Sequence, residues 1–285
     1  MSSDHQEYCL IGTEVWTSPS PPMMNAAFAA KSIDATYFAF SVRSDELEQR
    51  FKELRKRKVS GVNVTLPFKS SVMALLDETD EVSSRIGAVN VVRRSESKYV
   101  GYNTDVDGVV KPLTTRFAGL QIERALVIGA GGAARAFVEA MRRLGCGRVT
   151  VLARDELRGR RVVDEMGKTS TGVELDLQGL QEAGKLMGGE FDILFNATPI
   201  GSRGIALPEQ IKNLLSPKMI VFDAVYGPKD TELIREAEER GCRVVHGYEM
   251  LLEQGVAAFE LWTGASAPRG VMERAVLDFL GGEGN

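Results

Sequence analysis

The sequence has few of the residues that build metal centres and covalent catalytic sites. Only two of its 285 residues are histidine, His5 and His246, and only three are cysteine: Cys9, Cys146 and Cys242. An odd number of widely spaced cysteines excludes a disulfide framework and a C-x-x-C metal or redox motif. Two distant histidines give almost no support to a histidine-based metal site or a Ser-His-Asp triad. We therefore expect no bound metal.

Long apolar runs and an excess of basic charge are also lacking. No uninterrupted apolar stretch approaches the ~18 residues of a membrane span, and Met1–Tyr8 does not have the pattern of a signal peptide. The 35 Lys and Arg residues are outnumbered by 39 Asp and Glu residues, which gives a net charge of −4 and no strongly basic surface for nucleic acid. We expect a cytoplasmic protein that binds neither nucleic acid nor a membrane.

The sequence does contain a regular alternation of predicted strands and helices. Residues 125–128 form a continuous apolar run, typical of a parallel strand that is buried on both faces. The alternation predicts an α/β fold with parallel sheets. Strands are expected at 8–12, 36–41, 62–65, 88–93, 99–102, 149–153, 193–196, 220–223 and 243–245, and helices at 22–33, 45–58, from Pro67, 133–144, 231–240, 248–264 and 267–280.

A glycine-rich turn follows the apolar strand at 125–128 and opens a helix. Glycines allow the chain to turn sharply there and bring backbone N–H groups close to a pyrophosphate, whose charge the helix N-terminus stabilises. This context predicts a doubly wound, Rossmann-type dinucleotide site, and a strand–helix turn without a ligand is the alternative. The expected cofactor contacts in this turn are Gly129, Ala130, Gly131, Gly132 and Ala133.

The end of the next strand bears on the choice of cofactor. Ala153 is followed by Arg154, Asp155 and, one helical turn later, Arg158. The planar guanidinium groups suit the 2′-phosphate of NADP, whereas a carboxylate there suits the free 2′-hydroxyl of NAD. The pattern favours NADP, with use of NAD left open; a solvated pair of arginines is the other interpretation.

Three polar clusters in the first half of the chain are candidates for a substrate site. Ser18 and Ser20 alternate with prolines in what we expect to be an extended loop, where both hydroxyls can hold a small anion; a Ser/Pro turn is the simpler interpretation of that motif taken alone. Asn63 and Thr65 lie on one face of a predicted strand, and Lys69 follows in the helix expected from Pro67. The third cluster is Asn90 together with residues 103–105.

Together these segments resemble shikimate dehydrogenase over nearly the whole chain. The motifs occur in the family's order, which makes the resemblance specific. They are SPSPPMMNAAF at 18–28, GVNVTLPFK at 61–69, IGAVN at 86–90, GYNTD at 101–105, GAGGAARA at 129–136, NATPIG at 196–201, FDAVYGP at 222–228 and GYEMLLEQ at 247–254.

The resemblance implies the reversible, NADP-dependent reduction of 3-dehydroshikimate to shikimate on the route to aromatic amino acids. Lys69 and Asp105 would then be the catalytic pair, and Ser18 and Ser20 would bind the substrate carboxylate. The family's other motif positions imply substrate contacts for Asn63, Thr65, Asn90, Tyr226 and Gln254, and cofactor contacts for Thr198, Val225 and Gly247. A lysine near a carboxylate suits this chemistry, because reduction of a ketone creates an alkoxide that needs a proton.

The resemblance also implies two domains with an interdomain cleft: residues 1–108 and 245–285 for the substrate, and residues 109–244 as a Rossmann domain for NADP. A monomer or homodimer is expected. Three alternatives stay open. One is a quinate/shikimate dehydrogenase that uses NAD or both cofactors, another is a ligand sensor without activity, and the third is an enzyme for a different cyclic hydroxy acid.

Overall fold

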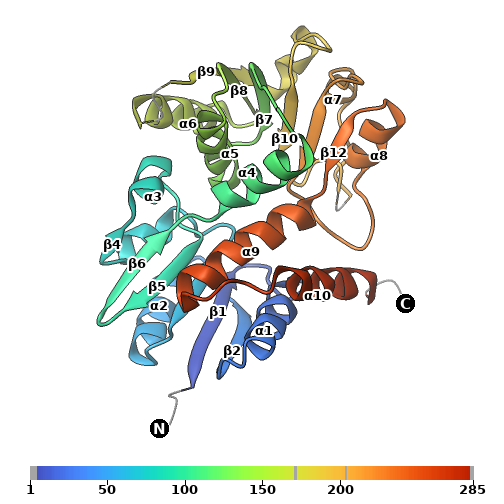
Figure 1. Cartoon of the computed structure of the whole chain (residues 1–285). Helices are drawn as coiled ribbons and strands as arrows, with labels where there is room; N and C mark the ends of the chain where they lie inside the picture. The colour runs from blue at the N-terminus through green and yellow to red at the C-terminus, as the bar shows by residue number, and fades with distance from the viewer. Residues whose placement is uncertain (1–4, 170–171, 203, 283–285) are drawn as a thin grey trace. The chain divides into compact units, whose positions relative to one another are not determined.

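The structure, a computed structural model of the chain, describes residues 5–169, 172–202 and 204–282. The chain divides into two compact units (Figure 1). Unit 1 comprises Met1–Thr104 and Leu251–Asn285, and unit 2 comprises Asp105–Met250. The first four residues of Met1–Tyr8 lie outside the described residues. Within the described ranges, no helix has both the length and the apolar character needed to cross a membrane.

Unit 1 is built on a six-stranded mixed sheet with the strand order β2-β1-β3-β5-β6-β4. Strands β1 and β2 pair in parallel, as do β1 and β3, whereas β3–β5 and β5–β6 are antiparallel. Only two residues connect β5 to β6, and such a connection joins antiparallel strands alone. The expectation of parallel pairing therefore fails in this part of unit 1. The strands are β1 (Gln6–Gly12), β2 (Ala35–Ser41), β3 (Gly61–Val64), β4 (Glu78–Thr79), β5 (Val91–Ser95) and β6 (Lys98–Tyr102).

The helices of unit 1 begin and end where local chemistry permits. Pro21 and Pro22 occupy the first turn of α1, where a missing N–H costs nothing. The Asp80 side chain accepts a hydrogen bond from Ser83 N–H at the start of α3, which ends at Gly87 with a positive φ. The helices are α1 (Ser20–Ala30), α2 (Leu47–Lys56), α3 (Glu81–Ile86), the 3₁₀ helix η1 (Ser71–Leu75), α9 (Gly247–Thr263), which begins in unit 2, and α10 (Arg269–Gly282).

The prediction of a helix from Pro67 is wrong. The Leu66–Pro67 peptide bond is cis, and a turn precedes η1, which begins only at Ser71. Phe68 N–H donates to the Thr65 carbonyl, 2.9 Å away, and the buried Phe68 side chain anchors the turn in the core. The chain is thus held in a turn by packing that local sequence pattern does not reveal.

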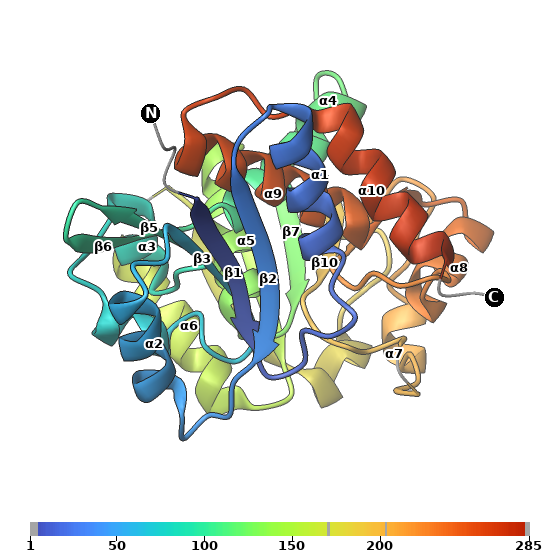
Figure 2. The ribbon, with the colours of Figure 1, turned by 90° about the horizontal axis from the view of Figure 1, so that it is seen from below.

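Aromatic side chains join the C-terminal helices to the unit 1 sheet. The ring of Tyr8 in β1 lies 5.0 Å from Phe28 in α1 and 4.9 Å from Trp262 in α9. Phe259 of α9 packs against Phe28, and Trp262 Nε1 donates to the Val92 carbonyl, 3.0 Å away. Helix α10 lies beside α1 (Figure 2). Elements near the two ends of the sequence, β1 and α1 on one side and α9 and α10 on the other, therefore pack together in unit 1.

Unit 2 is a parallel six-stranded sheet with the strand order β12-β11-β10-β7-β8-β9. This is the doubly wound order of a Rossmann fold, in which the order reverses between β7 and β10 and the ligand crevice lies at their carboxyl ends. The predicted fold class is confirmed. The strands are β7 (Arg124–Ile128), β8 (Arg148–Ala153), β9 (Glu174–Gly179), β10 (Ile193–Asn196), β11 (Ile220–Asp223) and β12 (Arg243–Val245); the helices are α4 (Asp105–Arg116), α5 (Gly132–Arg143), α6 (Glu156–Thr169), η2 (Leu180–Lys185), α7 (Glu209–Lys212) and α8 (Glu232–Glu239).

Candidate active site

A buried amide cluster lies at the carboxyl end of β3 in unit 1. Asn63 Oδ1 accepts a hydrogen bond from the Tyr37 hydroxyl at 2.7 Å, and its Nδ2 donates to the Asn90 carbonyl at 3.3 Å. That carbonyl also accepts from Val64 N–H at 2.8 Å. Asn63 and Asn90 are 6% and 2% exposed. The two asparagines are therefore held in fixed orientations, Asn63 in β3 and Asn90 directly before the neighbouring strand β5.

Asn90 also joins this cluster to two segments that are distant in sequence. Its Oδ1 accepts from Thr104 N–H at 2.7 Å, and its Nδ2 donates to Thr104 Oγ1 at 3.0 Å and to Gln254 Oε1 of α9 at 3.3 Å. The structure thus brings together three residues predicted to contact substrate: Asn63, Asn90 and Gln254. Thr104, which belongs to the same predicted polar cluster as Asn90, is bonded to that asparagine through both its backbone and its hydroxyl.

Lys69 lies half-buried in the turn that follows Thr65, which is also half-buried. The Lys69 carbonyl accepts from Val89 N–H at 2.7 Å, which fastens the turn to the segment that leads into Asn90. Lys69 is therefore placed by backbone bonds beside the amide cluster of unit 1, and not by the helix that the sequence predicted. Asp105 is buried, follows Thr104 directly and is the first residue of α4 and of unit 2.

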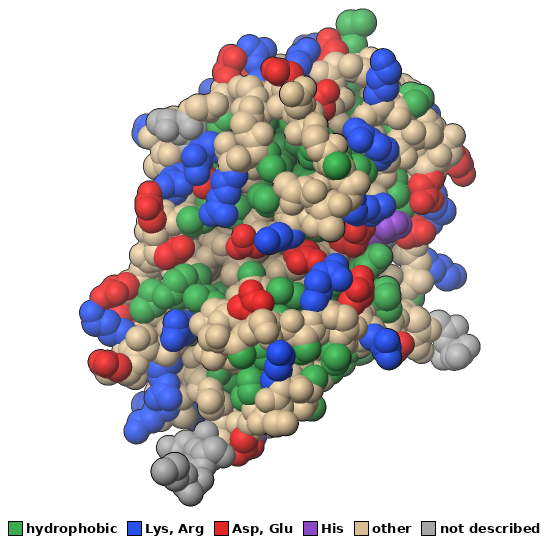
Figure 3. Space-filling model, in the orientation of Figure 1, with side chains coloured by type: hydrophobic (Ala, Val, Ile, Leu, Met, Phe, Trp, Pro, Cys, Tyr) green, Lys and Arg blue, Asp and Glu red, His purple; other side chains and the backbone are tan. Residues whose placement is uncertain are grey.

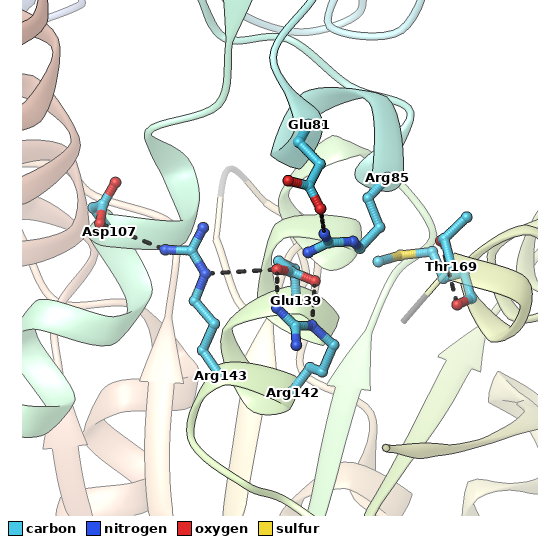
Figure 4. Close-up of polar contacts among 8 residues, drawn as sticks. Glu81, Arg85, Asp107, Glu139, Arg142, Arg143 and Thr169 are labelled. Atoms are coloured by element: carbon cyan, nitrogen blue, oxygen red, sulfur yellow. Dashed lines mark hydrogen bonds and ion pairs between the residues drawn. The ribbon is translucent and has the colours of Figure 1, made fainter. Parts of the chain in front are cut away.

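Ion pairs within α5 extend to the start of α4 through Arg143. The Arg142 guanidinium donates twice to the buried Glu139 carboxylate, at 2.9 and 2.8 Å, and Arg143 Nε lies 3.5 Å from the same group. Arg143 also reaches Asp107 of α4, at 3.9 Å (Figure 4). Burial raises the pKa of Asp107, and Arg143 opposes that shift. Arg143 therefore links the first turn of α4, which begins at Asp105, to the helix that opens at the glycine-rich turn.

The prediction that Ser18 and Ser20 lie in an extended loop is wrong. Ser20 is the first residue of α1, and Pro19 before it has a ψ of 0°, which is not extended. Ser18 Oγ accepts a hydrogen bond from Ser20 N–H at 3.2 Å, so it supports the start of the helix. The prolines that suggested a loop serve instead in the first turn of α1. Both serines are largely buried at this position.

The glycine-rich turn of unit 2 is tightly packed at its start and open at its next glycine. Gly129 has a φ of +116°, and a Cβ there would lie 2.8 Å from Thr198 Cγ2, so a side chain is excluded on two grounds. A Cβ at the exposed Gly131 would meet nothing within 4 Å, which means that open space adjoins the turn. The turn opens the twelve-residue helix α5, whose first N–H groups have no partner within the helix. A diphosphate therefore fits this turn, which also includes Ala130, Gly132 and Ala133.

At the end of β8, Ala153 is buried and Arg154 is exposed. Asp155 Oδ1 accepts from Arg158 N–H at 3.2 Å, and Oδ2 lies 3.2 Å from Arg158 Nε. Asp155 therefore caps α6, a structural role that the sequence analysis did not consider. Because the Asp155–Arg158 ion pair is exposed, its contribution to stability is small.

A fully buried polar network at the ends of β10 and β11 was missed by the sequence analysis. Asn196 and Asp223 are direct partners in the parallel ladder, and Asn196 Nδ2 donates to Asp223 Oδ1 at 3.0 Å. Asp223 also accepts from Val225 N–H at 3.0 Å and from the Thr231 hydroxyl at 2.6 Å. One feature of the sequence could have indicated this network: each of two apolar strands ends in a polar residue, Asn196 in β10 and Asp223 in β11.

The buried Asp223 should make stability depend on pH. Burial raises its pKa from 3.8 to about 6, although hydrogen bonds from Thr231, Val225 and Asn196 oppose the shift. Between these values the folded protein keeps a proton that the unfolded chain has released, so the free energy of unfolding falls as pH rises. The stabilisation that protonated Asp223 gives to the folded protein is fully present below the pKa of this group in the unfolded chain and is lost above about pH 6.

Asp223→Asn cannot ionise and should lack this dependence. From about pH 4 to about pH 7 we expect the variant to gain up to ~3 kcal/mol of unfolding free energy relative to the natural protein. Urea unfolding of both proteins across this range provides the measurement. A stability difference that stays constant with pH would contradict the argument.

Three family models match the chain in succession. The shikimate dehydrogenase substrate binding domain matches residues 10–92, the shikimate / quinate 5-dehydrogenase model matches residues 112–239, and the shikimate 5′-dehydrogenase C-terminal domain matches residues 247–277. These segments fall in both units and contain every predicted site residue except Asp105.

Individual proteins agree with the family models. A shikimate dehydrogenase (NADP(+)) of Archaeoglobus fulgidus is 39% identical over 273 residues, which are 95% of this chain and 97% of that protein. The shikimate 5-dehydrogenase of Thermus thermophilus, solved with NADP(H) and shikimate, has a TM-score of 0.82 at 33% identity and covers 96% of this chain and 100% of its own. Quinate dehydrogenase of Corynebacterium glutamicum with NAD has a TM-score of 0.87 at 27% identity, covering 96% and 99%.

Proposed function

Because the chain belongs to the shikimate dehydrogenase family, we propose that it catalyses the reversible, NADP-dependent reduction of 3-dehydroshikimate to shikimate, a step of aromatic amino acid biosynthesis. The observation that carries the proposal is the relationship to NADP-dependent shikimate dehydrogenases over 95% of the chain. The buried amide cluster beside Lys69 and the open glycine-rich turn support it, because the substrate is a polyhydroxylated acid and the cofactor is a dinucleotide.

Unit 1 would bind the substrate. Ser18 and Ser20 would donate to its carboxylate from the start of α1, where the partial positive charge of the helix N-terminus adds to the attraction. The residues proposed to contact its ring hydroxyls or to orient the catalytic pair are Asn63, Thr65, Asn90 and Gln254; Tyr226 is proposed to lie near its carboxylate. The side-chain amides of Asn63, Asn90 and Gln254 are held by hydrogen bonds, which supports recognition of a particular arrangement of hydroxyls.

Lys69 and Asp105 are the proposed catalytic pair. When bound, the cofactor supplies hydride to the ketone carbon. Lys69 Nζ would stabilise the alkoxide that develops on the substrate oxygen and donate a proton to it, and Asp105 would assist by holding the ammonium group in place. The hydrogen bond that the Lys69 carbonyl accepts from Val89 N–H supports this role, because it holds the turn that carries the lysine.

Unit 2 would bind the cofactor. The turn from Gly129 to Ala133 would bind the diphosphate, and Arg154 and Arg158 would face the 2′-phosphate of NADP beside Ala153 and Asp155. Thr198, Val225 and Gly247 would line the remaining part of the dinucleotide. Because Asp155 caps α6 and pairs with Arg158, the exposed Arg154 would make the main contact with the 2′-phosphate.

Dehydrogenation of quinate with NAD is the second candidate. The likeness to a quinate dehydrogenase solved with NAD favours it, and so does the carboxylate of Asp155 at the end of β8. A ligand sensor without activity is the remaining class. Parallel incubations with shikimate and NADP+ and with quinate and NAD+ separate these possibilities: we expect formation of NADPH and 3-dehydroshikimate in the first, whereas binding of shikimate without turnover of either acid would support a sensor.

We further propose that the protein acts in the cytoplasm as a monomer or homodimer and does not bind nucleic acid. Acidic and basic side chains are interspersed on the face shown in Figure 3, which supports the last point. The chain resembles both shikimate dehydrogenases and a quinate dehydrogenase. With either candidate substrate, the proposed reaction oxidises a ring hydroxyl.

Combined replacement of Ser18 and Ser20 by alanine is expected mainly to raise KM for shikimate. Each hydrogen bond lost to a charged group corresponds to roughly 1.5–3 kcal/mol. Initial rates at varied shikimate concentration give the result, and thermal unfolding shows whether the loss of the Ser18–Ser20 contact has weakened α1. If KM is unchanged in a variant that still folds, the two serines do not bind the substrate and serve only at the start of α1.

A further inference from the structure

Two neighbouring strands of unit 2 end in the same kind of turn. Asn196 Oδ1 accepts from Thr198 N–H at 3.1 Å, and Asp223 Oδ1 accepts from Val225 N–H at 3.0 Å. Each is a side chain that bonds to the backbone two residues on, as in an Asx-turn. The two turns lie at the carboxyl ends of β10 and β11. These strands form the half of the Rossmann sheet on the other side of the topological switch point from β8 and β9, and the glycine-rich turn follows β7 at that switch point.

The two turns are coupled through one buried hydrogen-bond network. Asn196 Oδ1 also accepts from Thr198 Oγ1 at 2.7 Å, and its Nδ2 donates to the Ile200 carbonyl and to Asp223 Oδ1, each at 3.0 Å. The other oxygen of Asp223 accepts from Thr231, whose hydroxyl accepts in turn from Ile234 N–H at the start of α8. Both central side chains have no exposed surface. A satisfied network of this kind specifies a single arrangement.

Close backbone packing confines the same two turns from their other sides. A Cβ on Gly247 would lie 2.4 Å from the Val225 carbonyl oxygen, and a Cβ on Gly129 would lie 2.8 Å from Thr198 Cγ2. Val225 is therefore held between Asp223 and Gly247, and Thr198 between Asn196 and Gly129. Four separate contacts thus determine where Thr198 and Val225 stand.

We infer that Asn196 and Asp223 are positioning residues that set the two turns against which the nicotinamide half of the dinucleotide binds. The inference rests on the proposed function, because it needs a bound nicotinamide dinucleotide. Neither side chain is exposed, so neither touches the cofactor; each acts through the backbone N–H that it holds. His246, which is paired with Asp230 at 3.2 Å, lowers the pKa of Asp223.

The test compares two aspartates that each accept backbone N–H groups in unit 2. Asp223→Ala removes the acceptor of Val225 N–H at the carboxyl edge of the sheet. Asp192→Ala is the matched control, because Asp192 precedes β10 at the amino edge and accepts from Glu123 and Arg124 N–H at 2.8 and 3.0 Å. Asp223→Asn is the conservative variant, since its amide oxygen can still accept from Val225.

Two readouts do not depend on turnover: the Kd of NADPH from its fluorescence, and amide hydrogen exchange of residues 224–226. For Asp223→Ala we expect Kd to rise roughly tenfold, as one lost hydrogen bond would produce, with faster exchange in that segment. Asp223→Asn should restore Kd to within about threefold of the natural protein. Asp192→Ala should lower thermal stability and leave Kd unchanged.

Equal stability losses in the two alanine variants with unchanged NADPH affinity, or failure of asparagine to rescue, would overturn the inference while leaving the proposed function standing. Failure of the natural protein to bind NADPH would instead overturn the proposed function and the inference with it. Should Asp223→Ala not fold, Asn196→Ala carries the same test. It releases Thr198 and leaves the bonds of Asp223 to Val225 and Thr231 in place, so the same rise in Kd is expected and an unchanged Kd contradicts the inference.

Discussion

Lys69→Ala is expected to lower kcat for shikimate oxidation by roughly 10²–10⁴-fold, the usual range for loss of a general acid–base group. KM for shikimate should change far less, because the serines and the amide cluster that would bind the substrate remain. The fold should also remain, since the Lys69 carbonyl and not its side chain bonds to Val89. Initial rates at saturating shikimate and NADP+ provide the measurement.

Lys52→Ala is the matched control for Lys69→Ala. Lys52 is an exposed lysine of α2 whose ammonium group pairs with Glu48 at 2.6 Å, so it belongs to unit 1 but to none of the predicted site segments. Its replacement should leave kcat unchanged. A Lys69→Ala enzyme within about threefold of the natural kcat would mean that Lys69 is a surface lysine and that the assigned mechanism is wrong.

Arg154→Ala should weaken NADP binding by about 10- to 150-fold and leave NAD binding almost unchanged. The 2′-phosphate is the only chemical difference between the cofactors, and Arg154 directly follows the second strand of the nucleotide unit, where that ribose is expected. A guanidinium–phosphate bond contributes on the order of 1.5–3 kcal/mol, which gives the expected range. Titration of both reduced cofactors by fluorescence measures the two affinities.

Arg148→Ala is the control for this experiment, because Arg148 stands at the opposite end of β8 and pairs with Glu174. Asp155→Thr should act in the opposite sense and improve NADP over NAD. Threonine can still cap α6, so the change removes the carboxylate without removing the cap. The assignment fails if the natural enzyme prefers NAD, or if Arg154→Ala weakens both cofactors equally.

The buried parallel strands of unit 2 could be predicted accurately. The structure places β10 and β11 at 193–196 and 220–223, as expected, because strands covered on both faces are short apolar runs with abrupt polar ends. The strand expected at 243–245 is β12, which lies at an edge of the same sheet. The edge strand β9 (174–179) was not predicted. Its residues alternate between apolar and polar, and it lies at the end of the sheet beside β8.

Errors arose where tertiary contacts decide the local conformation. Pro67 lies in a turn because Phe68 is buried in the core, and Ser20 begins a helix because two prolines can occupy a first helical turn. The β5–β6 hairpin made the unit 1 sheet mixed, although both strands had been expected. Each error concerns how a segment packs or pairs, which periodicity alone does not specify.

The candidate site residues came from motifs, and the roles assigned to them stay predictions. The structure adds the bonds between them, such as those that join Asn90 to Thr104 and Gln254. It also adds the Asn196–Asp223 pair, which was contained in two quoted motifs without a role. These bonds join residues far apart in sequence, so one sequence read without its fold does not reveal them.

One measurement tests the central claim most directly: initial rates of reduction of NADP+ and of NAD+ with shikimate and, side by side, with quinate. The account predicts the highest kcat/KM for shikimate with NADP+, with a lower value for NAD+ because it lacks the 2′-phosphate that Arg154 would bind. A higher kcat/KM for quinate with NAD+ would contradict it, and so would absence of turnover in all four combinations.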